Sequence, residues 1–162
     1  MTTTHTKQPG RFTGMFKIML LAGTIDILLA FAYAWFKTGL KPAFILWYIS
    51  ATALGTTLES RAMVMFTGLL IHYLIAAGWV ALYWLAYSRV TLFRSRPWVA
   101  AFVYGVFVWC MMNLLIVPLW AHRPVPGITV SGLMSMLILI AAIGIPAAFG
   151  AQYSDRKYRT NL

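Results

Sequence analysis

The chain contains four long apolar stretches, and they constrain its fold more than any other feature. They cover roughly residues 16–36, 62–87, 98–120 and 128–151. Each is long enough for a helix to cross the hydrocarbon core of a bilayer, which takes about 20 residues. A transmembrane β-strand would alternate polar and apolar residues, and these stretches do not alternate. The sequence therefore predicts an all-α membrane protein with four transmembrane helices.

The composition supports a membrane location and argues against nucleic-acid binding. Of the 162 residues 61% are hydrophobic and 10% are charged, with a mean hydropathy of +0.78, values outside the range of soluble domains. The 13 Lys and Arg residues outnumber the three acids and give a net charge of +10. These cations flank apolar stretches, where they contact lipid headgroups, and form no basic face with interleaved aromatics. We expect membrane lipids as partners, and no nucleic acid.

A fifth apolar stretch, residues 42–58, is at the lower length limit for a span, and the distribution of cations decides its interpretation, because cytoplasmic loops carry an excess of Lys and Arg. With four spans and a cytoplasmic start, the nine inside cations are Lys7, Arg11, Lys17, Arg89, Arg94, Arg96, Arg156, Lys157 and Arg159. The four outside cations are Lys37, Lys41, Arg61 and Arg123. A fifth span would leave five inside and eight outside. We therefore predict that both termini lie in the cytoplasm.

The fifth stretch is then a short non-spanning helix on the outer side, over residues 42–55. Pro42 favours a helix start and Gly55 favours a helix end. Outside the apolar and aromatic residues, positions 44–54 hold only Ser50 and Thr52, so the helix lacks the polar face of one lying flat on a membrane. This composition favours partial burial against the bundle. The short links and the lack of internal repeats predict one domain, residues 1–162, folded as an antiparallel up-and-down bundle.

Asp26 is the most informative residue, because a carboxylate near the bilayer centre costs about 2.5 to 3.5 kcal/mol on insertion scales and is normally turned inward and paired. Gly23 and Ala30 lie on its side of the helix, and small residues there suit close contact with another helix. Two interpretations remain open. Asp26 couples proton movement to transport, or a neutral Asp26 hydrogen-bonds a neighbouring helix and has a structural role only.

Further polar residues lie at similar depth in the other spans and predict an intramembrane polar layer. Counting from the span ends places His72 and Asn113 slightly outside the midplane and Asp26 close to it. A hydrogen bond from Asp26 to His72 would fix the tautomer of the imidazole. Ser131 and Ser135, on one face of the fourth span, complete the predicted layer. Polar contacts of this kind also occur as structural links worth roughly 0.6 kcal/mol each.

A second group of polar residues falls on the predicted outer side. It comprises Glu59, Arg61, His122 and Arg123, which are either solvated helix ends or an external mouth where a membrane enzyme acts on a lipid-borne substrate. The sequence has no G-x-S-x-G, phosphate-binding glycine loop or H-E-x-x-H motif. One span histidine is too few for a bis-histidine haem, and no cluster has metal-ligand spacing. No cofactor and no catalytic residue is therefore identified.

A series of short motifs runs from about residue 20 to residue 120. They are Gly23-Thr24-Ile25-Asp26, Gly39 with Pro42, Ala53-Leu54-Gly55, Gly68-Leu69-Leu70-Ile71-His72, Arg96-Pro97-Trp98, Tyr104-Gly105, and Met112-Asn113 ahead of Val117-Pro118-Leu119. Their order resembles a group of small bacterial inner-membrane proteins with no established activity. The resemblance implies that Asp26, His72 and Asn113 belong together. Here Trp120 and His122 follow the Pro-Leu, where the group has small polar residues.

These features leave three functions open. The leading one is a non-enzymatic accessory or interaction subunit, which contacts other membrane subunits or a second copy through its lipid-facing Trp, Phe and Met residues. The second is a small proton-coupled transporter with Asp26 as the coupling acid, His72 as a relay and Asn113 as a polar ligand. Small multidrug exporters, with four helices and one acid in the first, are similar in design only. The third is a membrane enzyme at the outer-side mouth.

Overall fold

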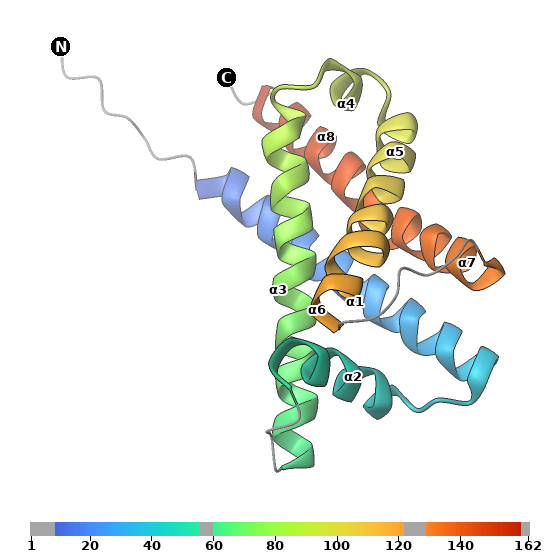
Figure 1. Ribbon diagram of the computed structural model, residues 1–162. Coiled ribbons are helices and arrows are strands. Elements are labelled where there is room, and N and C mark those ends of the chain that lie inside the picture. The colour runs from blue at the N-terminus through green and yellow to red at the C-terminus, as the bar shows by residue number, and fades with distance from the viewer. Residues whose placement is uncertain (1–8, 56–59, 122–128, 160–162) are drawn as a thin grey trace.

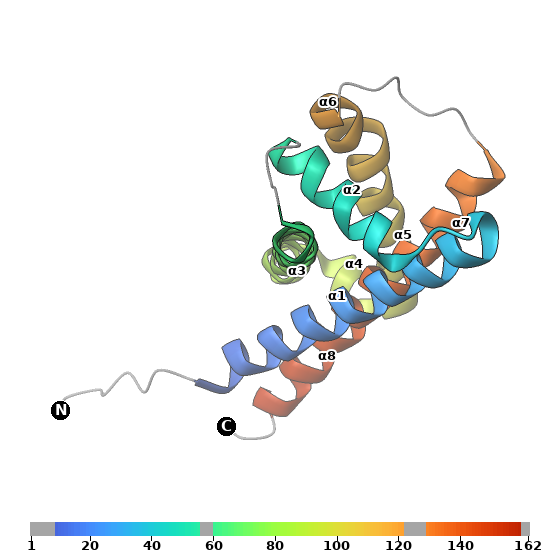
Figure 2. The same ribbon diagram turned by 90° about the horizontal axis from the view of Figure 1, so that it is seen from below.

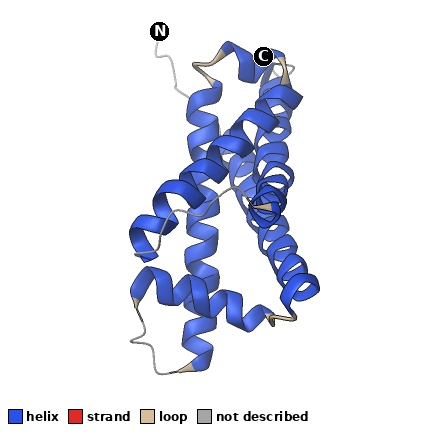
Figure 3. Cartoon of the chain, turned by 45° about the vertical axis from the view of Figure 1, so that its right-hand side comes forward, coloured by secondary structure: helices blue, strands red, loops and turns tan. Residues whose placement is uncertain are grey.

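The computed structural model describes residues 9–55, 60–121 and 129–159. Within these ranges every regular element is a helix (Figure 3). Four helices are long and apolar enough to cross a membrane, namely Thr13–Thr38, Arg61–Tyr87, Pro97–Ala121 and Val130–Lys157. The predicted all-α, four-span architecture is confirmed, and the chain is a multi-pass membrane protein.

Two of the spans are continuous helices and two contain a π-helical segment. The first span lies in α1 (Pro9–Thr38) and the second is α3 (Arg61–Tyr87). The third consists of α5 (Pro97–Cys110), η1 (Met111–Ile116) and α6 (Val117–Ala121), and the fourth of α7 (Val130–Leu139), η2 (Ile140–Gly144) and α8 (Ile145–Arg159). The short helix α4 (Thr91–Ser95) connects the second and third spans.

The spans pack as an antiparallel bundle with strongly inclined axes. The first span packs along the fourth, and Figure 2 shows α1 and α8 running side by side. The second span crosses α1, while the third packs along the fourth. Both described chain ends lie toward the end of the bundle that carries α4 (Figure 1). We call this the α4 end, and we call the opposite one the α2 end.

The short helix α2 (Pro42–Leu54) crosses α3 at the α2 end (Figure 1). It begins with Pro42, after an extended Lys41, and it ends at Gly55, whose φ of +77° belongs to the left-handed region that glycine favours. A Cβ atom on Gly68 would collide with the backbone carbonyl of Leu46. Only glycine at this place on α3 therefore allows the backbone of α2 to approach so closely.

Glycines also set the contact between the third and fourth spans. A Cβ atom on Gly105 would overlap Ile140, and one on Gly144 would overlap the carbonyl oxygen of Ala101. Such small residues let transmembrane helices approach and gain dispersion contacts, which replace the hydrophobic driving force that lipid does not supply. The third and fourth spans are therefore closely packed against each other.

Aromatic side chains fill the bundle toward the α4 end. The ring of Tyr83 stacks on Phe93 at 4.9 Å and meets Tyr104 edge-on at 4.9 Å, and Tyr87 completes what we call the aromatic cluster. All four residues are buried, and Tyr83 is 0% exposed. The hydroxyl of Tyr104 donates a hydrogen bond to the carbonyl oxygen of Trp79. The cluster thus links α3, α4 and α5 into one packed unit.

Each π-helical segment lies just before a proline. The segment Met111–Ile116 precedes Pro118, and Ile140–Gly144 precedes Pro146. A proline inside a helix lacks an N–H and its ring clashes with the carbonyl four residues earlier. Both of those positions, Leu114 and Ala142, lie inside the π-helical segments. The wider turn gives the ring room, so each span continues past its proline without breaking.

Candidate functional site

The first and second spans meet through the Gly23-Thr24 pair of α1. A Cβ atom on Gly23 would come within 2.7 Å of the Tyr73 ring, so glycine is needed for the helices to approach. The Thr24 hydroxyl is hydrogen-bonded to the Tyr73 hydroxyl at 2.8 Å. The imidazole Nε2 of His72 lies 2.9 Å from the carbonyl oxygen of Gly23. Because a carbonyl oxygen only accepts, Nε2 of His72 carries a hydrogen and donates it.

Asp26 lies one helical turn beyond this contact. Its Oδ2 atom is 4.0 Å from Nε2 of His72, at the outer limit of an ion pair, and the two side chains are 19% and 10% exposed. Among the described residues no donor lies within hydrogen-bonding distance of the carboxylate. The Asp26 to His72 interaction is therefore electrostatic, while the hydrogen bond of the imidazole goes to the backbone of Gly23.

Asp26 and His72 line the same cavity, which has a volume of about 220 Å³. All four spans and α2 contribute to its wall. Apart from the two polar side chains the lining is apolar and aromatic, and it includes Ala30, Ile49, Trp79, Val108, Met112 and Ile143. A carboxylate and an imidazole in otherwise apolar surroundings interact strongly with any charge that enters, because little polar material screens them.

The other three members of the predicted polar layer do not line this cavity. The Nδ2 atom of Asn113 donates to the carbonyl oxygen of Trp109 in its own span, at 3.1 Å. The indole N–H of Trp109 donates to Ser135 at 2.8 Å. The first bond stays within the third span, and the second joins the third span to the fourth.

Ser131 links the first and fourth spans. Its hydroxyl is hydrogen-bonded to the Tyr33 hydroxyl at 2.9 Å and also accepts from the ammonium group of Lys37. Lys37, Tyr33 and Trp109 are not members of the polar layer predicted from the sequence. The one-turn spacing of Tyr33 and Lys37 at the end of the first span was the available signal, since residues four apart share a helix face.

Most of the predicted outer-side mouth lies outside the described residues. This applies to Glu59, His122 and Arg123. The fourth residue, Arg61, begins α3 and lines an open groove beside α2. Among the described residues no three His, Cys, Asp or Glu side chains gather closely enough to hold a metal ion. Among the described residues, Asp26 and His72 form the carboxylate–imidazole pair inside the bundle.

Comparison with known proteins supplies no relative from which a function can be transferred. No protein-family model, no curated protein and no solved structure matches the chain. A function for this membrane protein is therefore inferred from the chemistry of its cavity. Acids and imidazoles that face a cavity within a membrane protein commonly mark the path of an ion or a substrate.

Proposed function

We propose that this protein is a small proton-coupled transporter in which Asp26 is the coupling acid and His72 a relay. The observation that carries the proposal is that the Asp26 carboxylate faces a cavity built by all four spans and accepts no hydrogen bond from the described residues. A purely structural acid would be bonded to a neighbouring helix. Here Gly23, Thr24 and Tyr73 make the contact between α1 and α3, which leaves the carboxylate accessible to a proton or a ligand.

The cavity favours a small organic cation as the transported species. Asp26 supplies one negative charge, while Trp79 and the aliphatic lining supply apolar surface. A cation with short alkyl groups satisfies both, because the indole face attracts positive charge and the wall contacts carbon. Protonation of Asp26 would remove the attraction and release the cation, which is how an acid couples two fluxes. Asn113 has no part in this proposal, since its side chain bonds its own helix.

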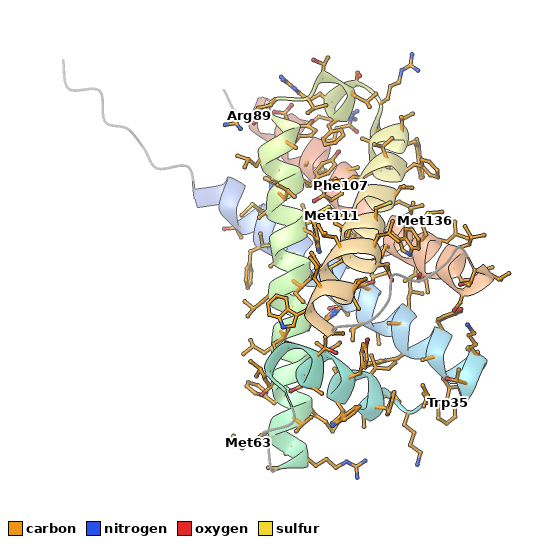
Figure 4. All side chains as sticks on the ribbon, in the orientation of Figure 1. Trp35, Met63, Arg89, Phe107, Met111 and Met136 are labelled. Carbon is orange, nitrogen blue, oxygen red and sulfur yellow. The ribbon has the colours of Figure 1, made fainter. Side chains whose placement is uncertain are left out.

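We also propose that the protein lies in a bacterial inner membrane, with both termini in the cytoplasm. Three arginines of the α4 end, Arg89, Arg94 and Arg96, lie between the second and third spans, at the end where the described chain ends lie. Figure 4 labels Arg89 at this end and Trp35 and Met63 at the other. Positive charge concentrates on the cytoplasmic side of inner-membrane proteins. The resemblance of the motifs to bacterial inner-membrane proteins supports the same location.

Proteoliposomes test this function directly. We expect tetraethylammonium, added to one side, to drive proton movement that an internal pH dye reports. Asp26→Asn should abolish that movement while the protein remains folded, because an amide cannot bind and release a proton at neutral pH. Asp155→Asn removes the other described acid, which does not line the cavity, and should keep the movement. Equal proton movement with Asp26→Asn and wild type would reject Asp26 as the coupling acid.

An accessory or interaction subunit is the second candidate, and a groove at the α2 end favours it. The groove has a volume of about 510 Å³, lies between α2 and α6, and is lined by Trp47, Tyr48 and Trp120 among others. Exposed aromatic residues are common where helices of different subunits meet. This candidate predicts a defined larger complex in mild detergent that persists with Asp26→Asn. A lone monomer without proton movement for any alkylammonium ion would contradict both candidates.

A further inference from the structure

A second groove at the α2 end differs from the cavity in both position and chemistry. It has a volume of about 570 Å³ and lies between the beginning of α2 and the beginning of α3. Lys41 and Arg61 bring two positive charges to it, and Phe44 and Trp47 bring aromatic rings. Of the two acids that the structure describes, Asp26 and Asp155, neither lines the groove. Its described lining is therefore positive and aromatic.

The position of α2 along α3 indicates how deep this groove lies. The tight contact at Gly68 fixes α2 at that level of α3. Gly68 and Tyr87 are 19 positions apart, which corresponds to about 28 Å along a helix and nearly equals the hydrocarbon thickness of about 30 Å. Since α3 ends at Tyr87, next to Arg89, the other membrane boundary falls near Gly68. The first turns of α3, with Arg61, then project into the headgroup layer.

The rings in the groove suit that layer. Phe44 and Trp47 are 44% and 43% exposed, and their ring centroids are 5.5 Å apart. Tryptophan favours the membrane interface, where its ring contacts both lipid chains and polar groups. Val64 and Met65 add an apolar wall from α3. The groove therefore offers two cations for a phosphate and an apolar surface for the carbons next to it.

We propose that this groove binds the headgroup of an anionic phospholipid, with Lys41 and Arg61 on the phosphate and Trp47 against the glycerol and first acyl carbons. The charge of the groove selects an anionic lipid over a zwitterionic one, and its apolar wall selects a lipid over a free phosphate. This site does not include Asp26, so its test is independent of the test of the transport proposal.

Native mass spectrometry of the whole protein tests the site. The protein would be released from nanodiscs that contain equal amounts of phosphatidylglycerol and phosphatidylcholine, and the lipids retained by each molecule counted. We expect wild type to retain phosphatidylglycerol selectively. The double variant Lys41→Gln with Arg61→Gln should retain it at least about tenfold less, because each basic residue near an anionic surface contributes substantially to lipid attraction.

The matched control removes the same charge at the α4 end. The double variant Arg89→Gln with Arg96→Gln should retain phosphatidylglycerol as wild type does. A second probe, Trp47→Ala, should weaken retention while the charge is intact, and glycerol 3-phosphate should not displace the lipid. Circular dichroism checks that each variant is folded. Equal loss in both double variants, or equal retention of the two lipids by wild type, would overturn the proposal.

Discussion

The aromatic cluster near α4 and the cavity near α2 both include residues of α3 and of the third span, yet they are filled in different ways. Tyr83 in the cluster is fully buried and contacts three other aromatic rings. The cavity holds about 220 Å³ of unfilled volume beside a carboxylate and an imidazole. The α4 half is thus closely packed, whereas the α2 half contains unfilled volume beside polar side chains.

Polar groups follow this division only around the cavity, because the hydroxyl of Ser50 on α2 is also buried without a hydrogen-bond partner among the described residues. In the α4 half the hydroxyl of Tyr83 and the indole N–H of Trp84 are buried without a hydrogen-bond partner among the described residues. Close packing there outweighs the cost of leaving those two groups unsatisfied. In the α2 half His72 is bonded to Gly23, and the acid beside it faces open volume. Regions that sacrifice packing for exposed polar groups are usually those that function requires.

The largest effect should come from truncation in the cluster. Tyr83→Ala removes a ring that stacks on Phe93 and meets Tyr104, and large aromatic truncations in cores cost about 3 to 5 kcal/mol of unfolding free energy. Ile75→Ala, which is 38% exposed and lines the cavity, should cost less than half as much. Unfolding in a detergent titration measures both values. Similar costs would mean that the two halves do not differ in packing.

Enlarging an alanine gives a sharper comparison of the two halves. Ala101 is 1% exposed and its carbonyl abuts Gly144, so Ala101→Leu should lower the unfolding free energy by about 1 to 3 kcal/mol through overpacking. Ala30 lines the cavity, so Ala30→Leu should fold normally and fill the space. It should still abolish tetraethylammonium-driven proton movement. A destabilised Ala30→Leu protein would show that the cavity wall cannot accommodate added volume.

The smallest expected change in unfolding free energy is an increase, opposite in sign to the two changes above. Asp26→Leu removes an acid that accepts no hydrogen bond in the described structure, while His72 keeps its bond to Gly23. We expect the unfolding free energy to rise by on the order of 1 kcal/mol, because an apolar side chain replaces a poorly paired ionisable group. Thermal unfolding in detergent gives the sign. A less stable variant would indicate that Asp26 has a structural role.

The four spans, the short helix and the similar depth of Asp26 and His72 follow from features visible in the sequence. Apolar length defines a span, and counting from the span ends gives each polar residue its depth. The acceptor for His72 could not be predicted in this way. The acceptor is the backbone carbonyl of Gly23. Every residue has such a carbonyl, so the residue types do not indicate which one is used. This one can be reached because glycine lets α1 and α3 approach closely.

The placement of Asn113, Ser131 and Ser135 was less accessible to prediction for a different reason. Depth is the same for every direction around a helix, so it does not say which neighbour a side chain will contact. Asn113 also lies within η1, where the 3.6-residue periodicity used to assign faces does not apply. The partners of the two serines are Tyr33 and Trp109, aromatic residues that depth alone does not single out.

The π-helical segments determine how this sequence can change by insertion or deletion. A π turn accommodates one residue more than an α turn, so deleting one residue from Ile140–Gly144 would restore a regular helix instead of breaking the span. Because the wider turn absorbs the extra residue, the segments before and after it would keep nearly their present orientation relative to each other. Ser131 and Ser135 would then keep their partners on α1 and α5, whereas a deletion within Val130–Leu139 would rotate the residues before it by about 100° and shift them by about 1.5 Å. The π-helical segments are thus the places where these spans tolerate a change in length.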